Sequence, residues 1–164
     1  MAEFIGFHMT HIKIFEATQN QILVCDTLRS PIGARGGALS TVTAPYLAAL
    51  TIKSLMARHP YLKPSDLTSI VLGSAIQAGE SGGSFARSAA LMAGLAPELL
   101  AQAVSSGQTS GISAFFTATT QIMAEMSGLT LVAGADLMSR APYAMPKQNT
   151  KHIWMVTIRN GKKF

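Results

Sequence analysis

The sequence predicts an α/β domain with a mostly parallel sheet, built in the order strand, helix, strand, helix, strand, helix, strand. Four short apolar runs alternate along the chain with three longer segments that have a helical period or an alanine-rich composition. The run LTSIVLGSAIQ, residues 67–77, is apolar almost throughout, which indicates a strand covered on both faces, as in a parallel sheet. We expect right-handed crossovers between the strands.

The first predicted strand is the run QILVCDT, residues 21–27, whose Val and Ile content is typical of a buried strand. It holds the only cysteine, Cys25, which we interpret as a small core residue, with a reactive thiol as the alternative. A single cysteine cannot form an internal disulfide, which fits a reducing compartment. The loop at residues 28–41 contains Pro31 and three glycines, a composition typical of a loop at a site or interface and equally of an ordinary surface connection.

The first predicted helix is APYLAALTIKSLMARHP, residues 44–60, which Pro60 ends. Its core-facing side is expected to carry the larger apolar side chains, Leu47, Leu50, Leu55 and Met56. We interpret His59 as a charge that complements the helix dipole at the C-terminal end.

The remaining elements follow in the same alternation. They are a flexible loop at residues 78–84, a short helix at 85–95 that ends at Gly94, a strand at 101–105, a helix at 111–126 and a strand at 129–135. With the first strand and first helix, they complete a βαβαβαβ pattern in one domain.

The net charge of +5 is carried by the end of the chain. Five of the 13 lysines and arginines lie within residues 147–164, which contain no acidic residue, so residues 1–146 hold eight basic and eight acidic residues. A neutral body with a basic tail favours a solvated end over a nucleic-acid arm, and we predict no nucleic-acid partner. The tail also contains the strand-like run HIWMVTI, and residues 1–20 form an extension without a clean period.

The sequence lacks the segments that direct a chain to or through a membrane. No stretch approaches the roughly twenty uninterrupted apolar residues of a membrane-spanning helix. Residues 1–15 lack the basic start, apolar run and cleavage site of a secretory signal. We therefore expect a cytoplasmic protein without a membrane span.

Four blocks of the sequence, in this order, resemble the N-terminal domain of thiolases, the acetyl-CoA acyltransferase family. The blocks are RSPIGARGGAL, VLGSAIQAGESGGSFARSAALMAGL, AVSSGQTSGISA and LVAGADLMSRAPY. The resemblance covers residues 21–146, with the extension at 1–20 and the basic tail at 147–164 outside it. It implies a thiolase-like N-terminal half, an acyl-CoA substrate class, and oligomers in which such domains meet.

The resemblance places Gln108 where the family has its nucleophilic cysteine, at the elbow between a strand and a long helix. In the family this cysteine is acylated, and the helix N-terminus favours its thiolate. An amide nitrogen is not a usable nucleophile, because its lone pair is delocalised into the carbonyl, so acyl transfer through Gln108 is excluded. The neighbouring hydroxyls have no recognisable base and are interpreted as caps and turn residues: Ser105, Ser106, Thr109 and Ser110.

Two further departures from the family pattern bear on function. The loop domain that holds CoA and the second α/β domain, with its two histidines and acid/base cysteine, are not found in this sequence. Where the family commonly has AGGxESMS, this chain has the shorter AGADLMS, with Asp136 near the position of the family's glutamate, which leaves the turn geometry open.

These departures predict a truncated thiolase-family domain or pseudoenzyme, an acyltransferase by resemblance but inactive as this chain. The alternative is a non-catalytic partner or scaffold, either a homodimer through residues 101–105 or a complex with a fuller thiolase chain. A third and less favoured alternative is a decarboxylase of the Gln type, in which the amide polarises a thioester or enolate oxygen, but that chemistry needs the two absent histidines. We predict no bound cofactor and no metal.

Overall fold

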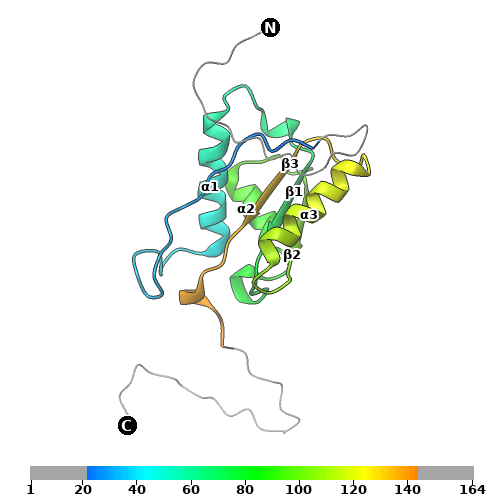
Figure 1. Cartoon of the computed structure of the whole chain (residues 1–164). Helices are drawn as coiled ribbons and strands as arrows, with labels where there is room; N and C mark the ends of the chain where they lie inside the picture. The colour runs from blue at the N-terminus through cyan, green and yellow to red at the C-terminus, as the bar shows by residue number, and fades with distance from the viewer. Residues whose placement is uncertain (1–21, 144–164) are drawn as a thin grey trace, which may run out of the picture.

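The computed structural model describes residues 22–143, and these form a three-stranded sheet between helices (Figure 1). The strands are β1 (Ser69–Gly73), β2 (Leu100–Val104) and β3 (Thr130–Gly134), in the order β2-β1-β3. Both pairings are parallel and in the same register, so Ser69 lies beside Leu100 on one side and Thr130 on the other. The predicted α/β class with a parallel sheet is confirmed.

The predicted first strand is wrong. Residues 22–30 are extended but form no strand, and within the described part of the chain none of their backbone groups pairs with the sheet. Ile22 is buried while the next residue, Leu23, is 65% exposed, so the segment covers the body with one face only. Cys25 is exposed, which overturns its interpretation as a core residue. Strand propensity in one segment does not provide the neighbouring strand that pairing requires.

Helix α1 (Ala44–Arg58) begins where the sequence predicts but buries a different face. Thr43 caps it, its Oγ1 accepting the Tyr46 N–H at 3.3 Å. The buried side carries mostly alanine, namely Ala44, Ala48 and Ala49 with Ile52, whereas Leu50 is 41% exposed. The expected face is therefore wrong at Leu50, while Leu47, Leu55 and Met56 are half-buried. Alanines dominate the fully buried side because α1 packs on a second alanine-rich helix, and small side chains on both let the backbones approach closely.

That second helix, α2 (Phe85–Ala93), shares one face of the sheet with α1. It presents Ala86, Ala89 and Ala90 to the core, and Phe85 is fully buried. Gly94 ends it with φ 80°, the left-handed conformation that glycine adopts at little cost. The predicted end of this helix at Gly94 is confirmed.

Helix α3 (Ser110–Met123) covers the opposite face of the sheet (Figure 1). Ala114 and Ala118 pack on Val71, whose side chain points away from the α1 and α2 layer. The sheet is thus covered on both faces at its central strand, and all five residues of β1 are buried. The extension at residues 1–20 and the tail at 147–164, with its run HIWMVTI, lie outside the described residues.

Candidate functional site

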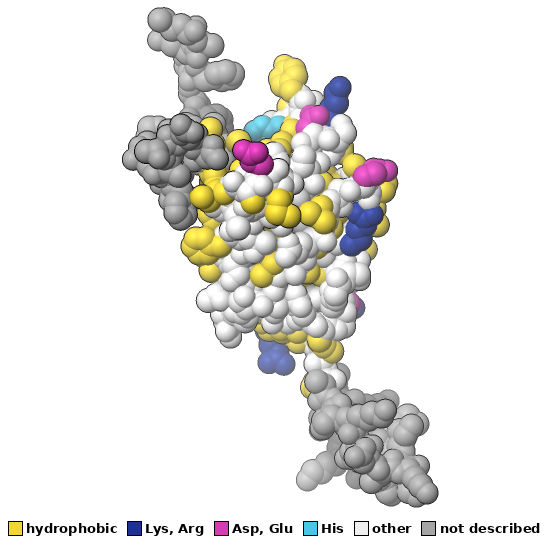
Figure 2. Space-filling view, turned by 90° about the vertical axis from the view of Figure 1, so that its right-hand side faces the viewer, with side chains coloured by type: hydrophobic (Ala, Val, Ile, Leu, Met, Phe, Trp, Pro, Cys, Tyr) yellow, Lys and Arg dark blue, Asp and Glu magenta, His cyan; other side chains and the backbone are white. Residues whose placement is uncertain are grey.

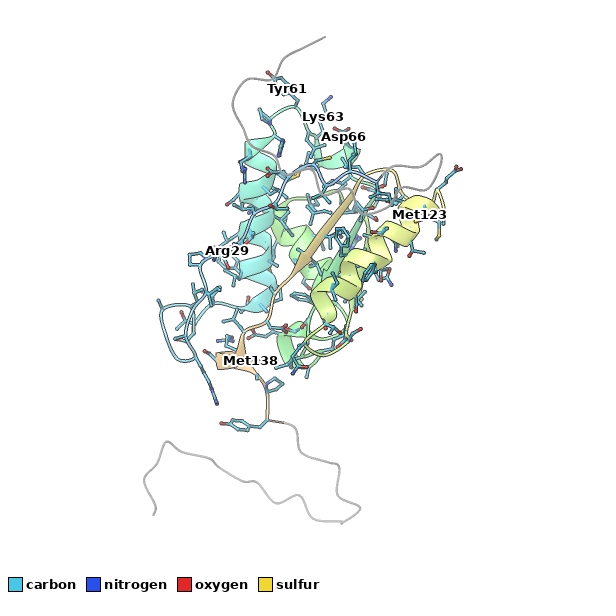
Figure 3. All side chains as sticks on the ribbon, in the orientation of Figure 1. Arg29, Tyr61, Lys63, Asp66, Met123 and Met138 are labelled. Atoms are coloured by element: carbon cyan, nitrogen blue, oxygen red, sulfur yellow. The ribbon has the colours of Figure 1, made fainter. Side chains whose placement is uncertain are left out.

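The carboxyl ends of the three parallel strands meet at one edge of the sheet, here called the carboxyl edge. It consists of the loop after β1 (74–78), the elbow between β2 and α3 (105–109) and the turn after β3 (135–137). Figure 3 shows Met138, just past this edge, at the end of the molecule opposite Lys63, Asp66 and Met123. The sequence-predicted position Gln108 therefore lies at the edge where ligands of parallel α/β folds bind.

The elbow passes close over the end of β1. A Cβ at Gly73 would lie 2.4 Å from the backbone oxygen of Ser110 and 2.9 Å from the backbone nitrogen of Gly111. No side chain fits at this position, because the groups in contact are backbone atoms that cannot turn aside. The glycine thus lets the first residues of α3 rest on the strand end.

Gln108 is exposed at the tip of this elbow. It follows Gly107, whose φ of 59° turns the chain, and precedes Thr109, the N-cap residue of α3. Within residues 22–143 no hydrogen bond holds the Gln108 side chain, so its amide faces solvent just before α3. The Thr109 and Ser110 N–H groups that follow it are bonded to the Ser106 and Gly107 carbonyls, at 3.3 and 3.1 Å. The position suits a ligand or reacting group, but the amide side chain there provides neither nucleophile nor base.

The hydroxyls next to Gln108 serve the backbone. Thr109 Oγ1 donates to the Ser106 carbonyl at 2.7 Å. Ser110 Oγ accepts the Ser106 N–H at 2.9 Å and lies 2.5 Å from the Gly107 carbonyl and 3.1 Å from the Ser74 carbonyl. These bonds fit the interpretation of both hydroxyls as turn residues rather than nucleophiles.

Asp136 lies in the turn after β3, whose geometry the sequence left open, and binds the loop after β1. Its carboxylate accepts the Ala75 N–H at 3.0 Å (Oδ1) and 2.9 Å (Oδ2), and Oδ1 also accepts the Ile76 N–H at 3.3 Å. Ser74 Oγ lies 2.8 Å from Oδ1 and is placed to donate to it. Sequence reasoning missed Ser74, although a small polar residue directly after a buried strand is a usual sign of a strand-end contact.

A second carboxylate, Glu80, joins the same edge to the segment after β3. Arg140 Nε donates to both Glu80 oxygens, at 2.8 and 3.0 Å, and Nη2 also contacts Oε1. The hydrogen bonds from Arg140 hold the pKa of Glu80 below its ordinary value, and those to Glu80 raise the pKa of Arg140. The pair links the short 3-10 helices η2 (Gly79–Ser81) and η3 (Met138–Arg140).

At the C-terminal end of α1, Asp26 connects residues 22–30 to the rest of the domain. Its Oδ2 lies 2.7 Å from His59 Nε2, and its Oδ1 lies 3.2 Å from Arg58 Nη2. The hydrogen bond with His59 is the main cause that lowers the pKa of Asp26, with the Thr27 N–H and the Arg58 charge adding to it. The sequence assigned His59 to the helix dipole and missed this contact, because the partner lies 33 residues away.

A cavity of about 380 Å³ lies between residues 28–35, α1 and the end of β3. Apolar groups such as Leu47 and Val132 line it together with Arg29 and Arg35. Gln108 is not among the lining residues, so the structure does not bring the predicted position and the cavity together.

The described residues limit other kinds of site. No group of three or more His, Cys, Asp or Glu side chains within 22–143 could hold a metal ion. In the same part of the chain, no helix is long and apolar enough to span a bilayer. The surface over α3 carries few charged side chains (Figure 2).

Residues 22–162 match the protein family described as "Thiolase, N-terminal domain". Among curated relatives, a β-ketoadipyl-CoA thiolase of Pseudomonas knackmussii is 38% identical over 130 residues, which cover 79% of this chain and 32% of the relative. A 3-oxoadipyl-CoA/3-oxo-5,6-dehydrosuberyl-CoA thiolase of Escherichia coli K12 is 39% identical over 127 residues, covering 77% of this chain and 32% of the relative.

The structure leads to the same group of proteins. The crystal structure of a Bacillus anthracis acetyl-CoA acetyltransferase superposes with a TM-score of 0.66 at 31% identity, over 75% of this chain and 32% of that one. The chain therefore spans about a third of the length of the curated relatives it matches.

Proposed function

Because this chain belongs to the thiolase family and corresponds to its N-terminal domain, we propose that it forms no acyl-enzyme at residue 108 and transfers no acyl group by itself. The single observation that carries the proposal is Gln108, which is exposed just before α3, at the position that the family resemblance assigns to the nucleophilic cysteine. An amide there does not attack a thioester, and the adjacent Thr109 and Ser110 hydroxyls are bonded to backbone carbonyls.

The test is a thiolysis and condensation assay on the purified full chain with acetoacetyl-CoA plus CoA, and with acetyl-CoA. We expect no turnover above a heat-inactivated control, and no acyl adduct on the intact protein by mass spectrometry. Turnover above that control, or an acyl adduct, would overturn the proposal, and its loss in the variant Gln108→Ala would show that the amide takes part in the chemistry.

A second candidate, a non-catalytic partner of a thiolase chain or of a second copy, is supported by two exposed features. Helix α3 contains no charged residue and exposes Ile112, Phe116 and Met123 (Figure 2 views this side). Strand β2 is at the edge of the sheet with Leu100 53% exposed, and its outer side has no neighbouring strand among residues 22–143. Apolar surface of this kind usually finds a partner.

Light scattering at micromolar concentration tests this candidate, on the chain alone and mixed with a purified full-length thiolase. We expect a homodimer or a mixed complex that Phe116→Glu weakens, while Leu91→Glu, at an equally exposed leucine of α2, leaves it intact. A well-folded monomer under both conditions would rule the candidate out.

The decarboxylase alternative receives no support from the described residues. His59, their one histidine, lies at the C-terminal end of α1 and contacts Asp26. The cytoplasmic location expected from the sequence stays a prediction.

A further inference from the structure

A continuous set of hydrogen bonds links the turn after β3 to the elbow that carries Gln108. Its first member is the Asp136 carboxylate, which receives two backbone N–H groups and faces the Ser74 hydroxyl from the loop after β1. Hydrogen bonds to a charged acceptor are roughly twice as strong as neutral ones. The loop after β1 is therefore fixed by a residue about 60 positions further along the chain.

The second step runs from this loop to the elbow. The Ser74 N–H donates to the Val104 carbonyl at 3.0 Å, and the Ser74 carbonyl lies 3.1 Å from Ser110 Oγ. Ser74 is fully buried and Ser110 is 3% exposed, so water cannot replace these bonds. Ser110 Oγ in turn accepts the Ser106 N–H, two residues before Gln108.

The third step is steric. Because the backbone of Ser110 rests on Gly73, a displacement at the end of β1 displaces the start of α3 as well. Hydrogen bonds and close packing thus connect the same two segments, and the loop after β1 stands between Asp136 and the elbow.

We propose that Asp136 is a positioning residue for residue 108: it fixes the loop after β1, and that loop fixes the Ser110 and Ser106 groups that shape the elbow. The carboxylate does not touch the group at position 108. The proposal rests on the proposed function only in taking residue 108 as the position that corresponds to the family's nucleophile.

A thiol installed at position 108 reports on this arrangement, because a helix N-terminus lowers the pKa of a thiol only when it is correctly placed. The experiment uses the full chain with Cys25→Ser, which removes the native thiol, and Gln108→Cys. The rate of alkylation by iodoacetamide, measured from pH 5 to 10, gives the pKa of the installed thiol. Asp136→Ala, Asp136→Asn and Ser110→Ala are then added separately.

The matched control is Asp66→Asn. Asp66 also accepts a backbone N–H, that of Lys63 at 2.8 Å, but it lies at the opposite end of the sheet (Figure 3). The Asp66→Asn variant therefore shows how losing a carboxylate that accepts a backbone N–H affects the thiol pKa when the elbow itself is unchanged.

We expect Asp136→Ala to move the thiol pKa toward the ~8.5 of free cysteine and to lower alkylation at pH 7 about tenfold. Asp136→Asn keeps one acceptor oxygen and should cause a smaller change. Ser110→Ala should match Asp136→Ala, and combining the two should add little, because both act on one path. Asp66→Asn should leave the profile unchanged.

An unchanged pH profile in folded Asp136→Ala, or full additivity with Ser110→Ala, would overturn the proposal. If Asp136→Ala does not fold, the Ser110→Ala and Asp136→Asn profiles decide in the same way. Alkylation needs no acyl transfer, so turnover by the wild-type chain would refute the proposed function and leave this inference standing.

Discussion

The carboxyl edge and the N-terminal flank, residues 22–42, each use an aspartate to join segments that are far apart in the sequence, but they hold it differently. Asp136 is exposed, but its carboxylate receives backbone N–H groups and faces the hydroxyl of the buried Ser74. Asp26 instead meets two side chains, Arg58 and His59, each 43% exposed. The edge depends on backbone N–H groups and on the buried Ser74 and Ser110 behind the exposed carboxylate, whereas the flank depends on ion pairs that salt and pH weaken.

The comparison separates the carboxyl edge, which fixes the relative positions of β1 and α3, from the flank, which is attached to the body mainly through side chains. Next to the carboxyl edge, β1 and α3 touch backbone to backbone at Gly73 and Ser110. The flank contributes no strand to the sheet and buries Ile22 as its one core side chain among residues 22–42. We therefore expect substitutions at the edge to cost more stability than equivalent substitutions in the flank.

The largest effect is expected for Gly73→Ala. The new methyl group would overlap backbone atoms of Ser110, and relieving the overlap must move β1 or α3, so the free energy of unfolding should fall by about 3 kcal/mol or more. Urea denaturation followed by circular dichroism measures it. Gly83→Ala is the control, since nothing lies within 4 Å of its Cβ position. Equal and small losses in both variants would contradict the close contact.

An intermediate effect is expected for Ser110→Ala. It removes the buried Ser110 hydroxyl, which accepts the Ser106 N–H and contacts the Gly107 and Ser74 carbonyls, and losing these bonds costs about 1–3 kcal/mol. Ser54→Ala removes an exposed hydroxyl that bonds only the Leu50 carbonyl of its own helix, and should cost less than about 0.5 kcal/mol. Chemical denaturation of the two variants side by side tests the difference, and a larger loss for Ser54→Ala would reverse our ranking.

The smallest effect is expected for Asp26→Asn, with a loss below about 1 kcal/mol because its partners are solvent-screened. The pKa of Asp26 is lowered by folding, so its contribution is complete above the ordinary value of 3.8 and disappears as the pH falls through the lower folded value. The difference between wild type and Asp26→Asn should therefore vanish in acid and shrink in 1 M salt. Glu98→Gln serves as the control on an exposed carboxylate. A difference that survives acid would show that the ion pairs are not its source.

Local patterns in the sequence predicted much of the fold but few of these contacts. The run at β1 and the Gly94 stop of α2 are local signals, and both elements form as expected. The segment at 21–27 has an equally good strand composition and fails, because pairing depends on a neighbour that composition does not specify.

The candidate site divides in the same way. The position of Gln108 at an elbow before a helix could be predicted, because strand, turn and helix are contiguous there. The partners of Asp136 and Asp26 could not be predicted, because they lie 61 and 33 residues away in the sequence, and a local hydrophobic pattern contains no information about such contacts.

The central place of β1 has a consequence for synthesis on the ribosome. All five of its residues are buried, yet both neighbouring strands are encoded later, and the second ends at Gly134. At roughly 5–20 residues per second, this fully buried strand waits several seconds for β3 to be made. During that interval the nascent chain exposes an unpaired strand, so its yield in cells should respond to chaperone supply and to slower translation downstream of residue 73.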